Sequence, residues 1–90
     1  MAEDQQITKA VLALRPYLNP LLDGEDMQAC DDALMAGEPM EALGWYFDTL
    51  TDQTAHDIPY NVLLDAFALL DDENKELYRH LMRQQQEIAA

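Results

Sequence analysis

Residues 39–50, PMEALGWYFDTL, decide the fold because they carry an apolar stripe at helical spacing. Steps of three, four and three residues separate Met40, Leu43, Phe47 and Leu50, so these side chains would lie on one side of an α-helix. Proline is favoured in the first turn of a helix, and the acidic Glu38 just before it suits the positive end of the helix dipole. We therefore predict a helix over residues 39–51 that buries this stripe.

Similar spacing on both sides of this segment predicts four more helices, over residues 4–17, 21–36, 62–70 and 73–88. The first is expected to bury Ile7, Val11, Leu14 and Leu18, and the second Met27, Cys30 or Asp31, and Leu34. The last two are expected to bury Leu63, Phe67 and Leu70, and then Leu77, Leu81 and Ile88 with Tyr78 and Met82 beside them. The chain is thus predicted to be all-α, a single-domain bundle of four to five short helices over residues 1–90.

Proline, glycine and capping residues set the expected helix boundaries. Pro16 should end or kink the first helix, and Asn19 followed by Pro20 should start the second. Gly37 should stop that second helix. Residues 52–57 are expected to form a loop before the helices capped by Asn61 and by Asp71 and Asp72.

The composition is unusual in its strongly negative charge. The chain has 18 Asp and Glu against 5 Lys and Arg, for a formal net charge of −13. Residues 16–74 contain fourteen of the acidic residues and no Lys or Arg. Such a surface repels nucleic acid and anionic lipid and attracts basic proteins. A purely solubilising surface could mix both signs of charge, although acidity for solubility alone is the alternative explanation.

A second stripe on the residue 39–51 helix is the main candidate for partner binding. Glu41, Trp45, Asp48 and Asp52 recur at i, i+4, i+7 and i+11 and would set an indole among carboxylates. Tryptophan is common at interface hot spots and attracts cations, although Trp45 could instead belong to the core. A second acidic patch, Asp31 and Asp32, could equally be a solvated helix face. The candidate partner-binding residues are Glu38, Glu41, Trp45, Asp48, Asp52, Asp31 and Asp32.

The residues that enzymes, metal sites and cofactor sites need do not occur here in recognisable patterns. There is no glycine-rich phosphate loop, nucleophile elbow or Cys/His metal spacing, and a small bundle rarely offers the cleft that tunes a catalytic carboxylate. His56 and His80 are interpreted as surface histidines and the single Cys30 as an inert core thiol. The absence of serine excludes a carrier with a serine-linked prosthetic group. We expect no enzyme activity, metal or cofactor, and no membrane or nucleic-acid contact, in a cytoplasmic protein.

The run ALMAGEPMEAL at residues 33–43 resembles the helix junction of the MafI-like immunity proteins, in which Leu-x-x-Gly-Glu-x-x-x-Ala-Leu joins two helices. Leu50, the sequence Asp57-Ile58-Pro59 and a helix start at Asn61 also resemble that family's pattern, so the likeness covers roughly residues 33–70. Gly44 departs from the pattern, where a larger helix former is expected. Pro39 and the acidic second helix depart from it too.

This resemblance implies an immunity protein, an antitoxin that binds and occludes a cognate secreted toxin or effector domain. The charge pattern independently favours a partner with a basic surface. The alternative is an acidic adaptor or chaperone for an exported effector, which would aid delivery rather than neutralise the effector. The sequence leaves open the toxin's chemistry, the secretion system, the oligomeric state and which acidic patch contacts the partner.

Overall fold

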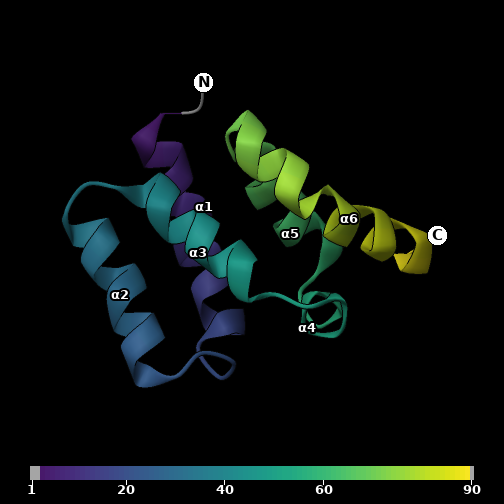
Figure 1. Cartoon of the computed structure of the whole chain (residues 1–90), viewed down its shortest axis with the longest axis horizontal. Helices are drawn as coiled ribbons and strands as arrows, with labels where there is room; N and C mark the ends of the chain where they lie inside the picture. The colour runs from purple at the N-terminus through teal and green to yellow at the C-terminus, as the bar shows by residue number, and fades with distance from the viewer. Residues whose placement is uncertain (1–2, 90) are drawn as a thin grey trace.

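Six helices follow one another in the computed structural model, which describes the backbone of residues 3–89 and the side chains of residues 3–85. They are α1 (Asp4–Leu18), α2 (Gly24–Met35), α3 (Pro39–Thr49), α4 (Asp52–His56), α5 (Tyr60–Ala68) and α6 (Asp72–Ala89). The all-α class is confirmed, with six helices in the described part of the chain rather than four to five. In Figure 1, α1, α2 and α3 form one half of a flat molecule and α4, α5 and α6 the other. Helix α1 packs on both α3 and α5, and α3 also reaches α6, so these contacts join the halves.

The core forms where α1 and α3 cross. The predicted stripe of α1 is confirmed, because Ile7, Val11, Leu14 and Leu18 are all buried. The largest fully buried side chain is Tyr46, which was not predicted to lie in the core. Its hydroxyl donates to Met27 Sδ at 3.8 Å, so this polar group enters the core with a partner. The neighbouring Phe47 ring packs against the rings of Phe67 and Tyr78, at centroid distances of 6.2 and 5.7 Å.

Helix α1 continues through Pro16 and ends at Leu18, so of the two expected effects of the proline, an end or a kink, the end does not occur. The hydrogen bond that the proline removes would join it to Leu12, and both residues are exposed, so water can solvate the freed carbonyl. The amide of Asn19 still donates to the carbonyl of Arg15 at 2.9 Å. Burial of Leu18 then favours the final turn.

Helix α2 begins at Gly24 rather than at residue 21, because Asp23 is its cap. The Asp23 carboxylate accepts from the amide of Asp26 at 2.8 Å, whereas Asn19, expected to start this helix, instead ends α1. The stop at Gly37 is confirmed. Gly37 has φ +77°, and the amide of Glu38 donates back to the carbonyl of Ala33 at 2.9 Å, as in a Schellman motif.

The segment expected to be a loop at residues 52–57 contains the short helix α4, so that expectation is wrong. Thr51 and Thr54 form a capping box, in which each side chain accepts from the other residue's amide, at 2.8 and 3.2 Å. The same cap ends α3 at Thr49 instead of Thr51. Helix α5 begins at Tyr60, directly after Pro59, and does not use Asn61 as its cap.

Helix α6 begins at Asp72, and the carboxylate of Asp71 accepts from the amide of Asn74 at 2.9 Å. Its buried face differs from the predicted stripe, because Leu77 is 57% exposed. The predicted burial of Leu81, with Met82 and the half-buried Tyr78 beside it, is confirmed where the helix packs on α5 and α4, and Gln85 is buried with them. Ile88, also predicted to be buried, lies outside the described side chains.

Candidate partner-binding surface

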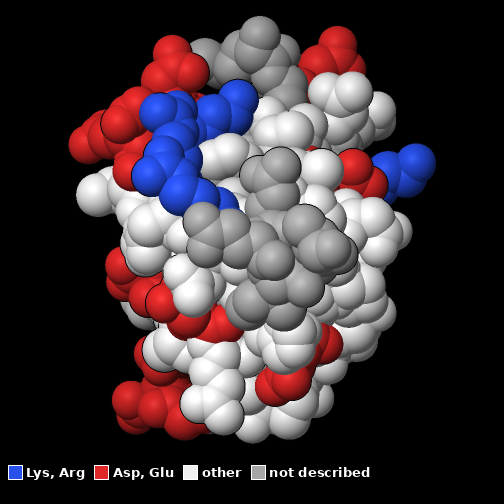
Figure 2. Space-filling view, turned by 90° about the vertical axis from the view of Figure 1, so that its right-hand side faces the viewer, with Lys and Arg blue, Asp and Glu red and all other residues white. Residues whose placement is uncertain are grey.

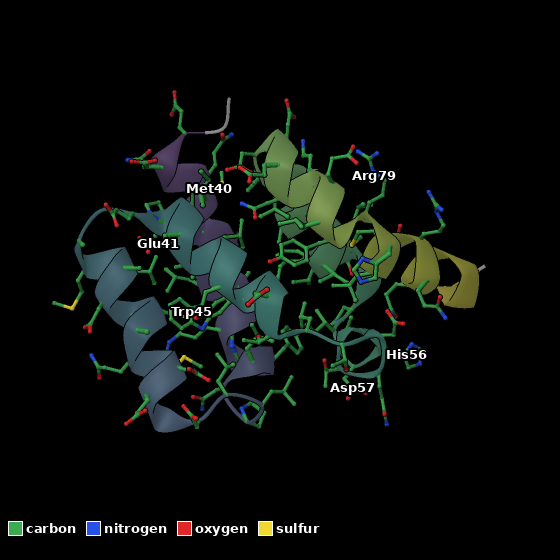
Figure 3. All side chains as sticks on the ribbon, viewed as in Figure 1. Met40, Glu41, Trp45, His56, Asp57 and Arg79 are labelled. Carbon is green, nitrogen blue, oxygen red and sulfur yellow. The ribbon has the colours of Figure 1, made fainter. Side chains whose placement is uncertain are left out.

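The outward face of α3 gathers four of the seven candidate residues. Ala42, Leu43, Tyr46 and Phe47 are buried in the core, and this turns the opposite side of the helix to solvent. Glu41, Trp45 and Asp48 are exposed there, and Glu38 lies just before the first helical residue. Figure 3 shows Glu41 and Trp45 along α3, with Arg79 well away on α6. The Trp45 side chain is 40% exposed, so it belongs to the surface and not to the fully buried core.

A shallow depression of about 290 Å³ lies over this face, between α3 and α6. Gly44 forms part of its floor, and its other lining residues are Glu41, Trp45, Asp48, Asn74 and Tyr78. The Tyr78 hydroxyl donates to Asp48 Oδ1 at 3.2 Å and so helps to orient that carboxylate. The volume lies just below the ~300–1,000 Å³ typical of small-molecule sites, so the depression suits a side chain better than a metabolite.

Negative charge is concentrated along this face. The pKa of Glu41 is raised because Glu38 shares a hydrogen bond with its carboxyl group and because the two negative charges repel. The pKa of Tyr78 is raised by burial and by the negative charge of Asp48. A cation arriving at this face would relieve the repulsion between the carboxylates.

Asp31 and Asp52 do not fit the arrangement expected from sequence. Arg15 neutralises Asp31 through two hydrogen bonds, Nε to Oδ1 at 3.2 Å and Nη2 to Oδ2 at 2.9 Å. Although residues 16–74 contain no Lys or Arg, Asp31 is therefore paired with a cation that lies just before this segment. Asp52 lies on α4 and not on the α3 stripe, because α3 ends first. Asp32 is exposed on α2 and accepts from Gln28 Nε2 at 2.8 Å.

The positive charges of the C-terminal segment lie on one side of α6. Lys75, Arg79 and Arg83 follow one another at four-residue steps, which brings them onto one helix face. Figure 2 shows Lys and Arg side chains gathered in a patch beside acidic groups. Arg79 pairs with Glu76 at 2.9 Å. Lys75, Arg79 and Arg83 therefore form a basic ridge along α6.

The remaining side chains with catalytic or metal-binding potential are scattered. His56 and Asp57, labelled in Figure 3, are exposed at the end of α4, beside a separate hollow that Tyr17 and Tyr60 also line. Cys30 is buried, and burial raises the pKa of its thiol to about 11. Within the part of the chain that the structure describes, no three His, Cys, Asp or Glu side chains are placed to hold a metal ion.

Three lining residues, Gly44, Asn74 and Tyr78, were not identified from the sequence. Tyr78 and Asp48 are thirty positions apart, and no local pattern indicates that they meet. Among the described residues, no helix combines the length and apolar character needed to cross a bilayer. No protein-family model, curated protein or solved structure matches the chain.

Proposed function

We propose that this protein is an immunity protein, an antitoxin that binds and occludes the basic surface of a cognate secreted toxin or effector domain in the cytoplasm. The observation that carries the proposal is the exposed indole of Trp45 between the carboxylates of Glu41 and Asp48. A large, rigid aromatic side chain with a polar rim is the typical centre of a protein–protein interface. The likeness of residues 33–70 to immunity proteins supports the same proposal.

The negative charge of this surface would determine which partners it attracts and how fast they associate. Glu38, Glu41 and Asp48 lie along one face, and the net charge of −13 extends the attraction beyond contact distance. A basic toxin cleft would be steered toward this face and then covered by it. Catalysis by the antitoxin is not required, since covering the toxin's active site is enough to neutralise it.

Growth rescue tests the proposal. If a neighbouring gene encodes a protein with a basic C-terminal domain, that domain is the candidate toxin, and wild-type protein should restore growth when the two are co-expressed. Trp45→Ala combined with Asp48→Lys should abolish rescue and weaken binding in a pull-down. A matched control is Leu64→Ala with Asp65→Lys on α5, because Leu64 is 41% exposed and the charge change is the same. Both double variants should retain the helical circular dichroism spectrum.

Equal rescue by the two double variants would remove the α3 face from the proposal. Failure of the wild-type protein to rescue growth, together with increased export of the effector, would replace the immunity function by that of an acidic adaptor or chaperone. The association rate should also fall steeply with added salt, because exposed charges are screened beyond about 8–10 Å at physiological ionic strength. An association rate that does not depend on salt concentration would contradict electrostatic steering.

A further inference from the structure

Gly44 is an unexpected residue for the middle of α3. It lies in the helix interior, where glycine is less favourable than every residue except proline. The helix does not require glycine here, since Gly37 is the glycine of the described chain that adopts positive φ. Packing does not require it either, because a Cβ atom at position 44 would meet Asn74 Nδ2 at 3.6 Å, an ordinary van der Waals contact.

Because glycine has no side chain, the space beside position 44 stays open. Gly44 lines the depression between α3 and α6, and any longer side chain there would project into it. Its lining residues include the aromatic Trp45 and Tyr78 and the carboxylate-bearing Glu41 and Asp48. Because Tyr78 binds Asp48 Oδ1, the second oxygen of that carboxylate is left for another donor.

The lining groups select the kind of side chain that fits. A planar guanidinium stacks on an indole and donates through its fork to a carboxylate, whereas a lysine ammonium is a compact charge that does neither as well. The cation nearest in sequence to Tyr78, Arg79, is paired with Glu76 on its own helix. Charge and shape therefore both favour a guanidinium from outside the molecule.

We propose that this depression binds an arginine side chain of the partner protein, between the Trp45 indole and the carboxylates of Glu41 and Asp48, and that Gly44 keeps the depression open. This inference rests on the proposed function, because it takes the partner to be a basic protein. It adds the identity of the anchoring side chain and a specificity-determining role for Gly44.

The direct test uses two tripeptides, acetyl-Gly-Arg-Gly-amide and acetyl-Gly-Lys-Gly-amide, titrated into the ¹⁵N-labelled protein. The arginine peptide should shift the Gly44 amide and the Trp45 indole N–H saturably, and the lysine peptide should bind more weakly. Gly44→Leu should remove the saturable shift, and Gly44→Ala should reduce the affinity. Gly24→Leu and Gly24→Ala are matched controls, since Gly24 is also helical and has open space around it. The two controls should bind the arginine peptide as the wild type does.

Saturable binding retained by Gly44→Leu, or small shifts spread equally over all acidic residues, would overturn the proposal. Equal affinity for the lysine peptide would overturn the identity of the anchoring side chain. If Gly44→Leu does not fold, Gly44→Ala decides, because its methyl group fits against Asn74 without a clash.

Growth rescue separates this inference from the proposed function. Rescue by wild-type protein but not by Gly44→Leu supports both. Rescue that survives Gly44→Leu leaves the immunity function standing and removes the depression from the toxin contact. Absence of rescue by the wild type, with arginine-peptide binding intact, overturns the proposed function and leaves the arginine site established.

Discussion

Replacing Phe47 by leucine should destabilise the protein by about 2–3 kcal/mol, because a fully buried ring that contacts two others is lost. Each aromatic pair contributes roughly 0.5–1.5 kcal/mol beyond the burial of its area, and the smaller side chain also leaves unfilled volume. For a chain of 90 residues, a loss of ~2 kcal/mol corresponds to a fall of about 10 °C in the melting temperature.

Thermal and urea unfolding followed by circular dichroism at 222 nm measure this loss. Phe67→Leu is the control, because the Phe67 ring is only half-buried, and it should cost less. The double variant Phe47→Leu with Tyr78→Leu should lose less than the sum of the two single variants, since the two rings share a contact. A Phe47→Leu loss below about 0.5 kcal/mol would refute the role assigned to this ring.

The aromatic cluster also links the core to the candidate partner-binding surface. Phe47 packs against Tyr78, and Tyr78 in turn holds Asp48. Phe47→Leu should therefore weaken partner binding even under conditions where the protein stays fully folded. Unchanged affinity in that variant would show that Asp48 is oriented without help from the core.

Two further predictions concern pH. Burial raises the pKa of Tyr46 from 10.0 to about 12, so this tyrosine ionises at a lower pH in the unfolded chain than in the folded protein. The stabilisation is fully present below pH 10, and the free energy of unfolding should fall by about 2–3 kcal/mol as the pH rises to about 12. Urea titrations between pH 9 and 12 measure this loss of stability, and Tyr46→Phe should reduce it. An equally steep fall in that variant would assign the loss to other groups. The hydrogen bond from Arg15 lowers the pKa of Asp31 below 3.8, so its stabilisation is present above that pH and is lost as the pH falls through the lower, folded-state value. Asp31→Asn should thus destabilise the protein at pH 7 and match the wild type in strong acid, whereas equal stability at pH 7 would contradict a stabilising pair.

Local patterns in the sequence predicted much of the fold. The stripe of α1 and the glycine that ends α2 depend on residues a few positions apart, and the structure confirms both. The errors arose where two local signals competed. Thr51 could continue one helix or cap another, and the capping box with Thr54 favoured a new helix. Leu77 fitted an apolar stripe, but the way α6 lies across α4 and α5 exposes it.

Only the α3 side of the candidate surface was predictable from the sequence. Helical spacing places Glu41, Trp45 and Asp48 near one another, and the exposure of Trp45 confirms that this face is open. The contribution of Tyr78 from α6 depends on tertiary packing, which the spacing of residues within one helix does not specify. The pairing of Asp31 with Arg15, sixteen positions away, also depends on tertiary packing and was not predicted.

The attachment of α2 differs from that of the other long helices. It packs mainly on α3, its buried residues are Met27 and Cys30, and the Arg15–Asp31 ion pair links it to α1. Elements with so little buried area open at a lower free energy than the whole molecule, so α2 amides should exchange with deuterium before those of α1 and α3. Trp45 thus lies on the more extensively packed α3, whereas the exposed Asp32 lies on the less extensively packed α2. Under the proposed function, the firmly packed helix would fix the anchoring side chain, while carboxylates on the less firmly packed helix would adjust to the surface of the partner.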